Sequence, residues 1–191
     1  MARRKSGNGV SKESIVEATV AAILATNLTD WTVDSVAGKA KCAKGLVLYH
    51  FKSKGALLLQ VADTIRNSVA NGRLEAVSGT AKGAAALDRL WGAMAEGNQS
   101  GEFGLWVGLL ADSRTRKAAA RATHDDADLI RASAEALGIQ RDSLALSLIP
   151  AALDGFALEL LQGNASANVR ERFDSFWLGV LSDAENERTV Q

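Results

Sequence analysis

The sequence predicts an all-α protein, and three observations support this. A single proline and an alanine- and leucine-rich body favour helices over the short, turn-punctuated strands of a sandwich or barrel. Apolar residues recur with a period near 3.6 along most of the chain. With 191 residues, of which 47% are hydrophobic and 23% charged, the chain is long enough to bury a core, and its composition is neither disordered nor fibrous.

Composition also excludes several classes of protein. No apolar run approaches the roughly 18 residues that a membrane span requires, and no basic-then-apolar signal segment opens the chain. Cys42 is the single cysteine, so it cannot form an internal disulfide. We therefore expect a cytoplasmic protein without a membrane partner.

The net charge of zero hides an asymmetry along the chain. Residues 1–60 contain nine Lys and Arg residues against four acidic residues, whereas the remainder contains thirteen against eighteen. A basic first third joined to an acidic body predicts that the first third contacts a polyanion. The body is not expected to do so, because phosphate would repel it.

The first predicted helix follows Ser11, a favourable N-cap, and places Glu13 near the positive end of the helix dipole. Asn27 tolerates the left-handed conformation and is predicted to end this helix. The apolar stripe of the helix consists of Ile15, Ala18, Ala22 and Ile23.

Two shorter helices are predicted next. Thr32 is placed to cap a helix over residues 33–40, and residues 41–43 form a three-residue connection to a third helix over residues 43–51. In that third helix, Leu46 and either Val47 or Leu48 are expected to face inward. Three short helices joined by tight turns are what a helix-turn-helix requires, with the last one lying in the major groove of DNA.

Residues 11–58 resemble, in register and without a gap, the DNA-binding domain of the TetR family of bacterial transcriptional regulators. The matching positions in the first two helices are Ile15, Ala18, Ile23, Thr32, Val36, Ala37 and Ala40. The family then reads s-K-G-t-l-Y-x-H-F-x-s-K-e-x-L, and the matching positions are Lys44, Gly45, Tyr49, His50, Phe51, Lys54 and Leu57.

The chain also departs from the family pattern. Lys41 stands where the family usually has a turn glycine, which predicts a less favourable backbone angle there. Ala43 and Leu46 replace residues that in the family are often hydroxylic, so these two positions cannot make the polar contacts to DNA that a hydroxyl would make. Cys42 and Leu48 replace a valine and an aromatic residue. The operator sequence therefore cannot be transferred from relatives.

Candidate DNA contacts lie at both ends of the predicted recognition helix. At its exposed start, Lys44 and Leu46 are expected to meet base edges, and Gly45 permits close approach. Phosphate contacts are expected for Tyr49, His50, Lys52 and Lys54, with Thr32 and Lys41 completing the set. For Tyr49 and His50 the alternative is that they only complete a packed helix end. Phe51 is expected in the core.

The predicted domain organisation has three parts. Residues 1–10 form a flexible basic arm that either lies in a minor groove or is a solvated tail. Residues 11–53 form the helix-turn-helix DNA-binding domain. Residues 54–191 form a helical domain that the resemblance assigns to effector binding and dimerisation. It is predicted to begin with a helix capped by Ser53 and ended at residue 71 or 72.

Further helices are predicted near residues 83–97, 103–112, 115–138, 143–163 and 168–186. Pro150 is expected either to kink the fourth of these or to start a new helix. Candidate pocket residues are Trp91, Met94, Phe103, Trp106 and Leu110, with simple core packing as the alternative. Candidate dimer contacts are Phe156, Leu160, Phe173, Phe176, Trp177 and Val180, for which packing within the monomer is equally consistent.

Catalytic and metal-binding motifs are missing from the sequence, and no cofactor or metal is expected. His124 and Asp128 are one helical turn apart, but an exposed acidic face explains this pair better than a metal site. The leading hypothesis is a sequence-specific transcriptional regulator, a homodimeric repressor that a small-molecule effector releases from a palindromic operator. The alternatives are a ligand-independent DNA-binding protein and a helical small-molecule binder or enzyme.

Overall fold

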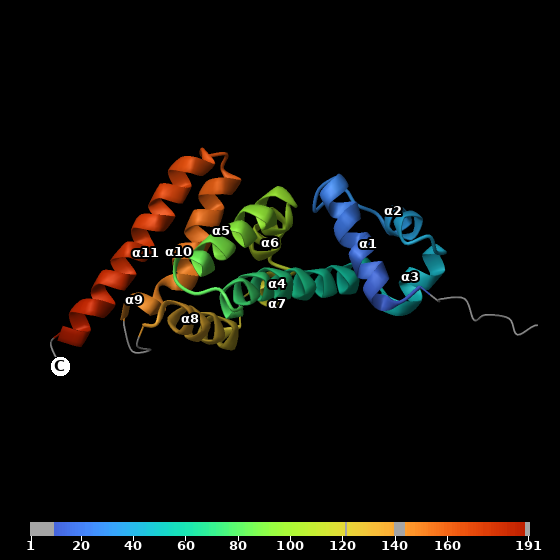
Figure 1. The fold of residues 1–191 in the computed structure, drawn as a ribbon. Helices are drawn as coiled ribbons and strands as arrows, with labels where there is room; N and C mark the ends of the chain where they lie inside the picture. The colour runs from blue at the N-terminus through green and yellow to red at the C-terminus, as the bar shows by residue number, and fades with distance from the viewer. Residues whose placement is uncertain (1–9, 121, 140–143, 190–191) are drawn as a thin grey trace, which may run out of the picture. The chain divides into compact units, whose positions relative to one another are not determined.

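In the computed structural model, which describes residues 10–120, 122–139 and 144–189, every regular element is a helix (Figure 1). The all-α prediction is confirmed. The elements are α1 (Lys12–Ala25), α2 (Val33–Lys39), α3 (Lys44–Phe51), α4 (Lys54–Ser78), α5 (Ala84–Gln99), α6 (Glu102–Ala111), α7 (Arg116–Ala119), α8 (Thr123–Leu137), α9 (Leu144–Ser147), α10 (Ile149–Leu161) and α11 (Ser166–Thr189). Among these described helices, none combines the length and apolarity needed to cross a bilayer.

Contacts group the described residues into two units. The first unit contains the residues up to Ile65 together with Gly108–Ala119, and the second contains Arg66–Val107 and the residues from Ala120 onward. Helices α4 and α6 each contribute residues to both units. The predicted domain boundary after residue 53 coincides with the start of α4 at Lys54 and stays a prediction. Residues 1–9 of the predicted basic arm lie outside the described part of the chain.

Helices α1, α2 and α3 of the first unit are held by capping bonds and a shared core. The Ser14 amide donates to Ser11 Oγ at 3.1 Å, which confirms Ser11 as the N-cap of α1. The predicted inward stripe of α1 is buried, and helix α2 packs against both α1 and α3. The core of this unit includes Ile15, Val16, Ala22, Ile23, Trp31, Val36, Val47, Phe51, Leu57 and Val61.

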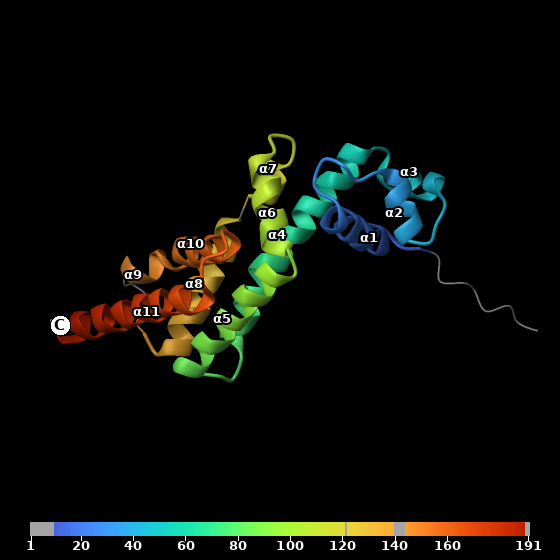
Figure 2. The same ribbon diagram turned by 90° about the horizontal axis from the view of Figure 1, so that it is seen from above.

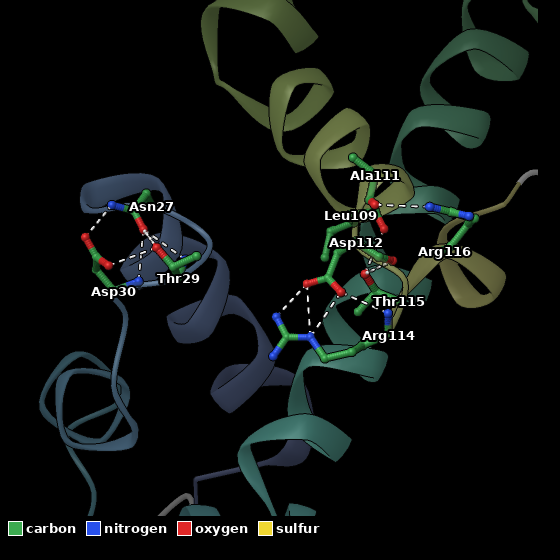
Figure 3. Close-up of polar contacts among 9 residues, drawn as sticks. All are labelled: Asn27, Thr29, Asp30, Leu109, Ala111, Asp112, Arg114, Thr115 and Arg116. Atoms are coloured by element: carbon green, nitrogen blue, oxygen red, sulfur yellow. Dashed lines mark hydrogen bonds and ion pairs between the residues drawn. The ribbon is translucent and has the colours of Figure 1, made fainter.

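Asn27 does not end α1, contrary to the prediction, because the helix stops at Ala25 with Thr26 as its C-cap. The Asn27 side chain instead organises the following loop. Its Oδ1 accepts hydrogen bonds from the amides of Thr29 and Asp30, and its Nδ2 donates to the Asp30 carboxylate (Figure 3). The hydrogen bonds from Asn27 and then Thr29 lower the pKa of Asp30.

Helix α4 begins as predicted but extends further. The Ala56 amide donates to Ser53 Oγ at 3.1 Å, so Ser53 supplies the cap. The helix continues to Ser78, and the predicted end at residue 71 or 72 is wrong. A glycine inside a helix costs only about 1 kcal/mol. Burial of Ala76 and Val77 in the core of the second unit outweighs that cost.

The turn between α6 and α7 belongs to the first unit and is closed by side-chain bonds (Figure 3). The buried hydroxyl of Thr115 donates to the carbonyl of Leu109 at 2.7 Å. The guanidinium of Arg114 donates to both carboxylate oxygens of Asp112, and the Arg114 amide donates to the same carboxylate at 2.9 Å. These bonds, the side-chain ones most, lower the pKa of Asp112 to about 2.

Acid is expected to remove the stability that the Asp112 carboxylate contributes. Because its folded-state pKa lies below the unfolded value, the contribution is complete above about pH 4 and is lost as the pH falls towards about 2. In urea denaturation, the difference in unfolding free energy between wild type and Asp112→Asn should therefore shrink between pH 5 and pH 2. In an Arg114→Gln background most of this pH dependence should disappear. An unchanged profile in that background would contradict the assignment.

The second unit has a core formed by α4, α5 and α8 to α11. Helices α10 and α11 lie side by side in both views (Figure 2), and α10 also packs against α5 and α8. Pro150 stands at the start of α10, where its missing N–H costs nothing, so it begins a new helix rather than kinking one. The core cluster includes Leu90, Met94, Leu129, Leu146, Ile149, Leu153, Phe173, Trp177 and Val180.

The prediction of one continuous helix over residues 115–138 is wrong, because the structure divides this range into α7 and α8. The division is stabilised locally: the Ala122 amide donates to the Asp125 carboxylate at 3.3 Å, and the Asp125 amide donates to the Ala122 carbonyl at 3.0 Å. Gly138 in the left-handed conformation, with φ of 69°, ends α8.

Candidate nucleic-acid interface

Helix α2 and the turn after it position the candidate recognition helix α3. The Ser35 amide donates to Thr32 Oγ1 at 3.0 Å and the Thr32 amide donates to Ser35 Oγ at 3.1 Å, a reciprocal capping box that confirms Thr32 as the N-cap of α2. Val36 and Ala37 anchor α2 in the core. Both the side chain and the amide of Thr32 are thus already used in capping.

Helix α3 is anchored on one face and exposed on the other. Val47 and Phe51 are buried, so of the two predicted inward alternatives Val47 is the core residue, while Leu48 is 37% exposed. Tyr49 is 69% exposed, an unusual position for a large aromatic side chain in a folded domain. The other exposed predicted contacts are Thr32, Lys41, Lys44, Gly45, Lys52 and Lys54, whereas Leu46 and His50 are half-buried.

The exposed end of α3 forms a cationic and aromatic cluster. The ammonium of Lys52 lies 5.2 Å from the centroid of the Tyr49 ring, and the rings of Tyr49 and His50 meet edge to face at 5.4 Å. This arrangement holds the aromatic ring of Tyr49 and the ammonium of Lys52 close together at the exposed end of α3.

Lys44 begins α3 and is tied to α2 by an exposed ion pair. Its ammonium lies 2.8 Å from the Asp34 carboxylate, and the two side chains are 54% and 69% exposed. An ion pair this exposed contributes at most about 1 kcal/mol. The Lys44 ammonium can therefore leave Asp34 at little cost in stability. Asp34 was not among the site residues predicted from the sequence.

The turn before α3 adopts the strained conformation that the missing glycine predicted. Lys41 has φ of 53°, a left-handed angle that costs a residue with a Cβ about 1 kcal/mol or more. Ala43, at the N-cap of α3, makes no side-chain capping bond. Lys41 and Ala43, two of the departures from the family pattern, thus lie in the turn that precedes α3.

Replacing Lys41 by glycine is expected to stabilise the protein by about 0.5–1 kcal/mol, because glycine adopts this φ without strain. Urea denaturation measures the change. The matched control is Lys39→Gly within α2, which should destabilise the protein by up to about 1 kcal/mol. Stability changes of the same sign at both positions would contradict the assigned strain.

Lys54, for which a phosphate contact is predicted, is exposed and also makes contacts within the first unit. Its ammonium donates to the backbone carbonyl of Trp31 at 2.6 Å and lies 4.5 Å from the centroid of the Trp31 ring. Trp31 itself is buried. Lys54 therefore joins the start of α4 to the loop before α2, and Trp31 is a partner that the sequence did not suggest.

Replacing Lys54 by methionine is expected to destabilise the first unit by about 1–2 kcal/mol, since the substitution removes both the hydrogen bond and the cation–π interaction. Chemical denaturation of the full chain is the measurement. Lys39→Met, at an exposed lysine on α2, is the control and should leave stability within about 0.5 kcal/mol. A Lys54→Met protein that keeps full stability would show that the contacts with Trp31 do not stabilise the first unit.

A cavity of about 280 Å³ lies in the second unit. Of the predicted pocket residues, Met94 and Phe103 line it. Trp91 instead packs edge to face on Phe173, at 5.4 Å between ring centroids. The full lining is Ser68, Val69, Gly72, Arg73, Ala93, Met94, Glu96, Gly97, Ser100, Glu102, Phe103 and Ala157.

The two remaining predicted pocket residues also lie elsewhere. Trp106 is buried beside Leu129, outside this cavity, and Leu110 belongs to the first unit. The polar lining residues were missed because they are dispersed over three helices, and a helical pattern does not tell which helices will face one another.

Comparison with known proteins supplies the fold. No protein-family profile matches the chain, and no curated protein sequence matches it. Several solved structures, however, are similar. A protein described as a TetR-family transcriptional regulator from Rhodococcus sp. superposes with a TM-score of 0.67 and 22% identity, covering 91% of this chain and 97% of that one. The chain has the TetR-family fold.

Two further solved structures agree. A transcriptional regulator from Pseudomonas aeruginosa PAO1 gives a TM-score of 0.61 at 18% identity, covering 92% of each chain. The multidrug-binding protein EbrR, complexed with imidazole, gives 0.59 at 18% identity, covering 86% of this chain and 93% of that one. Similarity at this level of identity establishes the fold.

The residues for which dimer contacts were predicted lie on α10 and α11. Phe173, Trp177 and Val180 are at most 3% exposed and belong to the core of the second unit, so they are not available to a partner. Phe156, Leu160 and Phe176 are half-buried. The apolar residues on the outside of these helices, and just before α10, are Leu148, Leu158, Leu161 and Leu178, which are 55%, 41%, 41% and 67% exposed.

The His124 and Asp128 pair also has a structural account. His124 is exposed and lies 3.1 Å from the Asp125 carboxylate, and Asp128 pairs with Arg131. Within the described residues, no group of three or more His, Cys, Asp or Glu side chains is arranged to hold a metal ion.

Proposed function

We propose that this protein is a sequence-specific, DNA-binding transcriptional regulator. The observation that carries the proposal is the exposed face of α3: an aromatic side chain that is 69% exposed, flanked by exposed lysines, on the third helix of a TetR-type helix-turn-helix. Exposing Tyr49 in this way does not stabilise the fold, but it makes the phenol accessible to a phosphate group. The in-register match of residues 11–58 to the family pattern supports the same conclusion.

We also propose that it acts as a cytoplasmic homodimer on a palindromic operator. The exposed leucines of α10 and α11 support this, because an apolar helix pair of this kind is normally covered by a second copy. Two α3 helices about 34–36 Å apart would then meet successive major grooves on one side of the duplex.

Release by a small-molecule effector completes the proposal. Helix α6 contributes Glu102 and Phe103 to the cavity of the second unit, and its last residues belong to the first unit. A ligand that prefers one position of α6 would therefore bias the first unit as well. The multidrug-binding activity in the name of EbrR is consistent with a binding cavity in this fold.

Binding of the purified chain to the intergenic DNA beside its own gene tests the proposal. We expect tight binding that a scrambled duplex of equal length does not show, with affinity that falls steeply between two salt concentrations. Repression and release are then tested by transcription in vitro with and without candidate effectors. Binding that ignores sequence would favour the alternative of a ligand-independent, nonspecific DNA-binding protein.

A further inference from the structure

We infer that the effector is a small organic cation with an apolar body, bound in the cavity of the second unit. This names the chemical class of ligand for the cavity and relies on the proposed function only for its regulatory consequence. The inference follows from how apolar and charged groups are distributed over the lining residues.

Apolar residues make up most of the buried part of the cavity lining. Met94, Phe103 and Ala157 are each at most 4% exposed, so their cavity-facing atoms are protected from solvent. Val69 and Ala93 add partly buried apolar surface. An aromatic or alkyl group that covers this surface gains affinity by leaving water.

The more accessible part of the lining carries the carboxylates. Glu96 is exposed and Glu102 is half-buried, so the charged ends of both side chains are within reach of solvent and of a ligand. Glu102 Oε2 accepts a hydrogen bond from Ser68 Oγ at 2.9 Å, which orients this carboxylate and leaves its other lone pairs for a ligand. A ligand whose apolar body lies on Met94 and Phe103 would thus place its polar end among two negative charges.

The one basic residue among the lining residues does not favour an anion. Arg73 is 5% exposed, and its guanidinium donates to the Asp154 carboxylate at 2.6 Å. This partly buried pair compensates its own charge. An anionic ligand would face Glu96 and Glu102 without a compensating cation, whereas a cationic ligand would be attracted by both.

The volume limits the size of the ligand. At about 280 Å³ the cavity is slightly smaller than the range of roughly 300–1,000 Å³ that is typical of ligand pockets. A single aromatic ring with a quaternary ammonium group suits this space better than a multi-ring compound.

Isothermal titration calorimetry of the full-length protein with three size-matched probes tests the inference. The probes are phenyltrimethylammonium, its uncharged isostere tert-butylbenzene, and the anion benzenesulfonate. We expect the cation to bind at least about tenfold more tightly than either of the others. Equal affinities for the cation and the isostere, or tighter binding of the anion, would overturn the inference.

A matched pair of variants locates the effect. In Glu96→Gln with Glu102→Gln, the preference for the cation over the isostere should fall to about twofold or less. In the control, Glu75→Gln with Glu171→Gln, two exposed carboxylates outside the cavity lining are neutralised and the preference should persist. A preference that survives in the cavity variant would show that the cation binds elsewhere.

Operator binding by the same proteins separates this inference from the proposed function. Without ligand, wild type and the cavity variant should bind the intergenic duplex equally well, since the substitutions lie outside the first unit. Loss of DNA binding in all proteins with retained cation preference would refute the regulator and leave the cavity assignment standing.

Discussion

Replacing Tyr49 and Lys52 together by alanine is expected to weaken operator binding by at least about 100-fold. Each substitution removes one predicted phosphate contact per protomer, and a hydrogen bond to a charged group contributes about 1.5–3 kcal/mol. Because Tyr49 is 69% exposed and Lys52 lies against its ring, the double substitution should leave the fold intact. Fluorescence anisotropy with a labelled operator gives the affinity, and circular dichroism checks the fold.

Salt dependence distinguishes the removal of a phosphate-binding group at the interface from a change in overall charge. In the double variant the slope of log affinity against log salt should fall by about one for each phosphate that is no longer neutralised. The control Lys82→Ala removes the same charge from the second unit and should leave both affinity and slope close to wild type. If Lys82→Ala weakened binding as much as the double substitution does, the cationic end of α3 would not be the interface.

The features of the fold that could be predicted from the sequence are those decided within a few residues. Ser11, Thr32 and Ser53 each cap the helix that was predicted after them, because a cap bonds to an amide three residues away. The positive φ of Lys41 was likewise predictable, since it depends on one turn. Asn27 shows the limit, because the same side chain that can end a helix can also organise a loop.

Features that depend on which helices meet could not be predicted. Asn71 and Gly72 resemble a helix end, yet α4 continues because Val77 reaches a core built from distant segments. The bond between Lys54 and the Trp31 carbonyl, 23 residues earlier, could not be predicted, because nothing near Lys54 along the chain points to Trp31. The cavity carboxylates were hidden for the same reason.

The aromatic residues of α11 illustrate a related ambiguity. A stripe at helical spacing indicates that one face is buried, but it does not identify what covers that face. Phe173 and Trp177 form edge-to-face pairs within the second unit, so the monomer itself covers them. Leu178 is the neighbour of Trp177 in sequence but points away from the core, and only coordinates separate these two roles.

Replacing Leu178 by glutamate is therefore expected to separate the proposed dimer while the second unit stays folded. A charge at a position that is 67% exposed in the monomer costs little there, but buried in an apolar interface it would lack a partner. Light scattering should report a monomer, and urea denaturation at the same protein concentration should still show a cooperative transition. Affinity for the palindromic operator should fall at least about 100-fold, because a monomer binds only one half-site.

Phe173→Ala is the contrasting control. That side chain is fully buried, so its truncation should destabilise the second unit by about 3–5 kcal/mol, a large part of the stability of an ordinary domain. A Leu178→Glu protein that remains a dimer and binds its operator as wild type does would show that this face of α11 is not the interface.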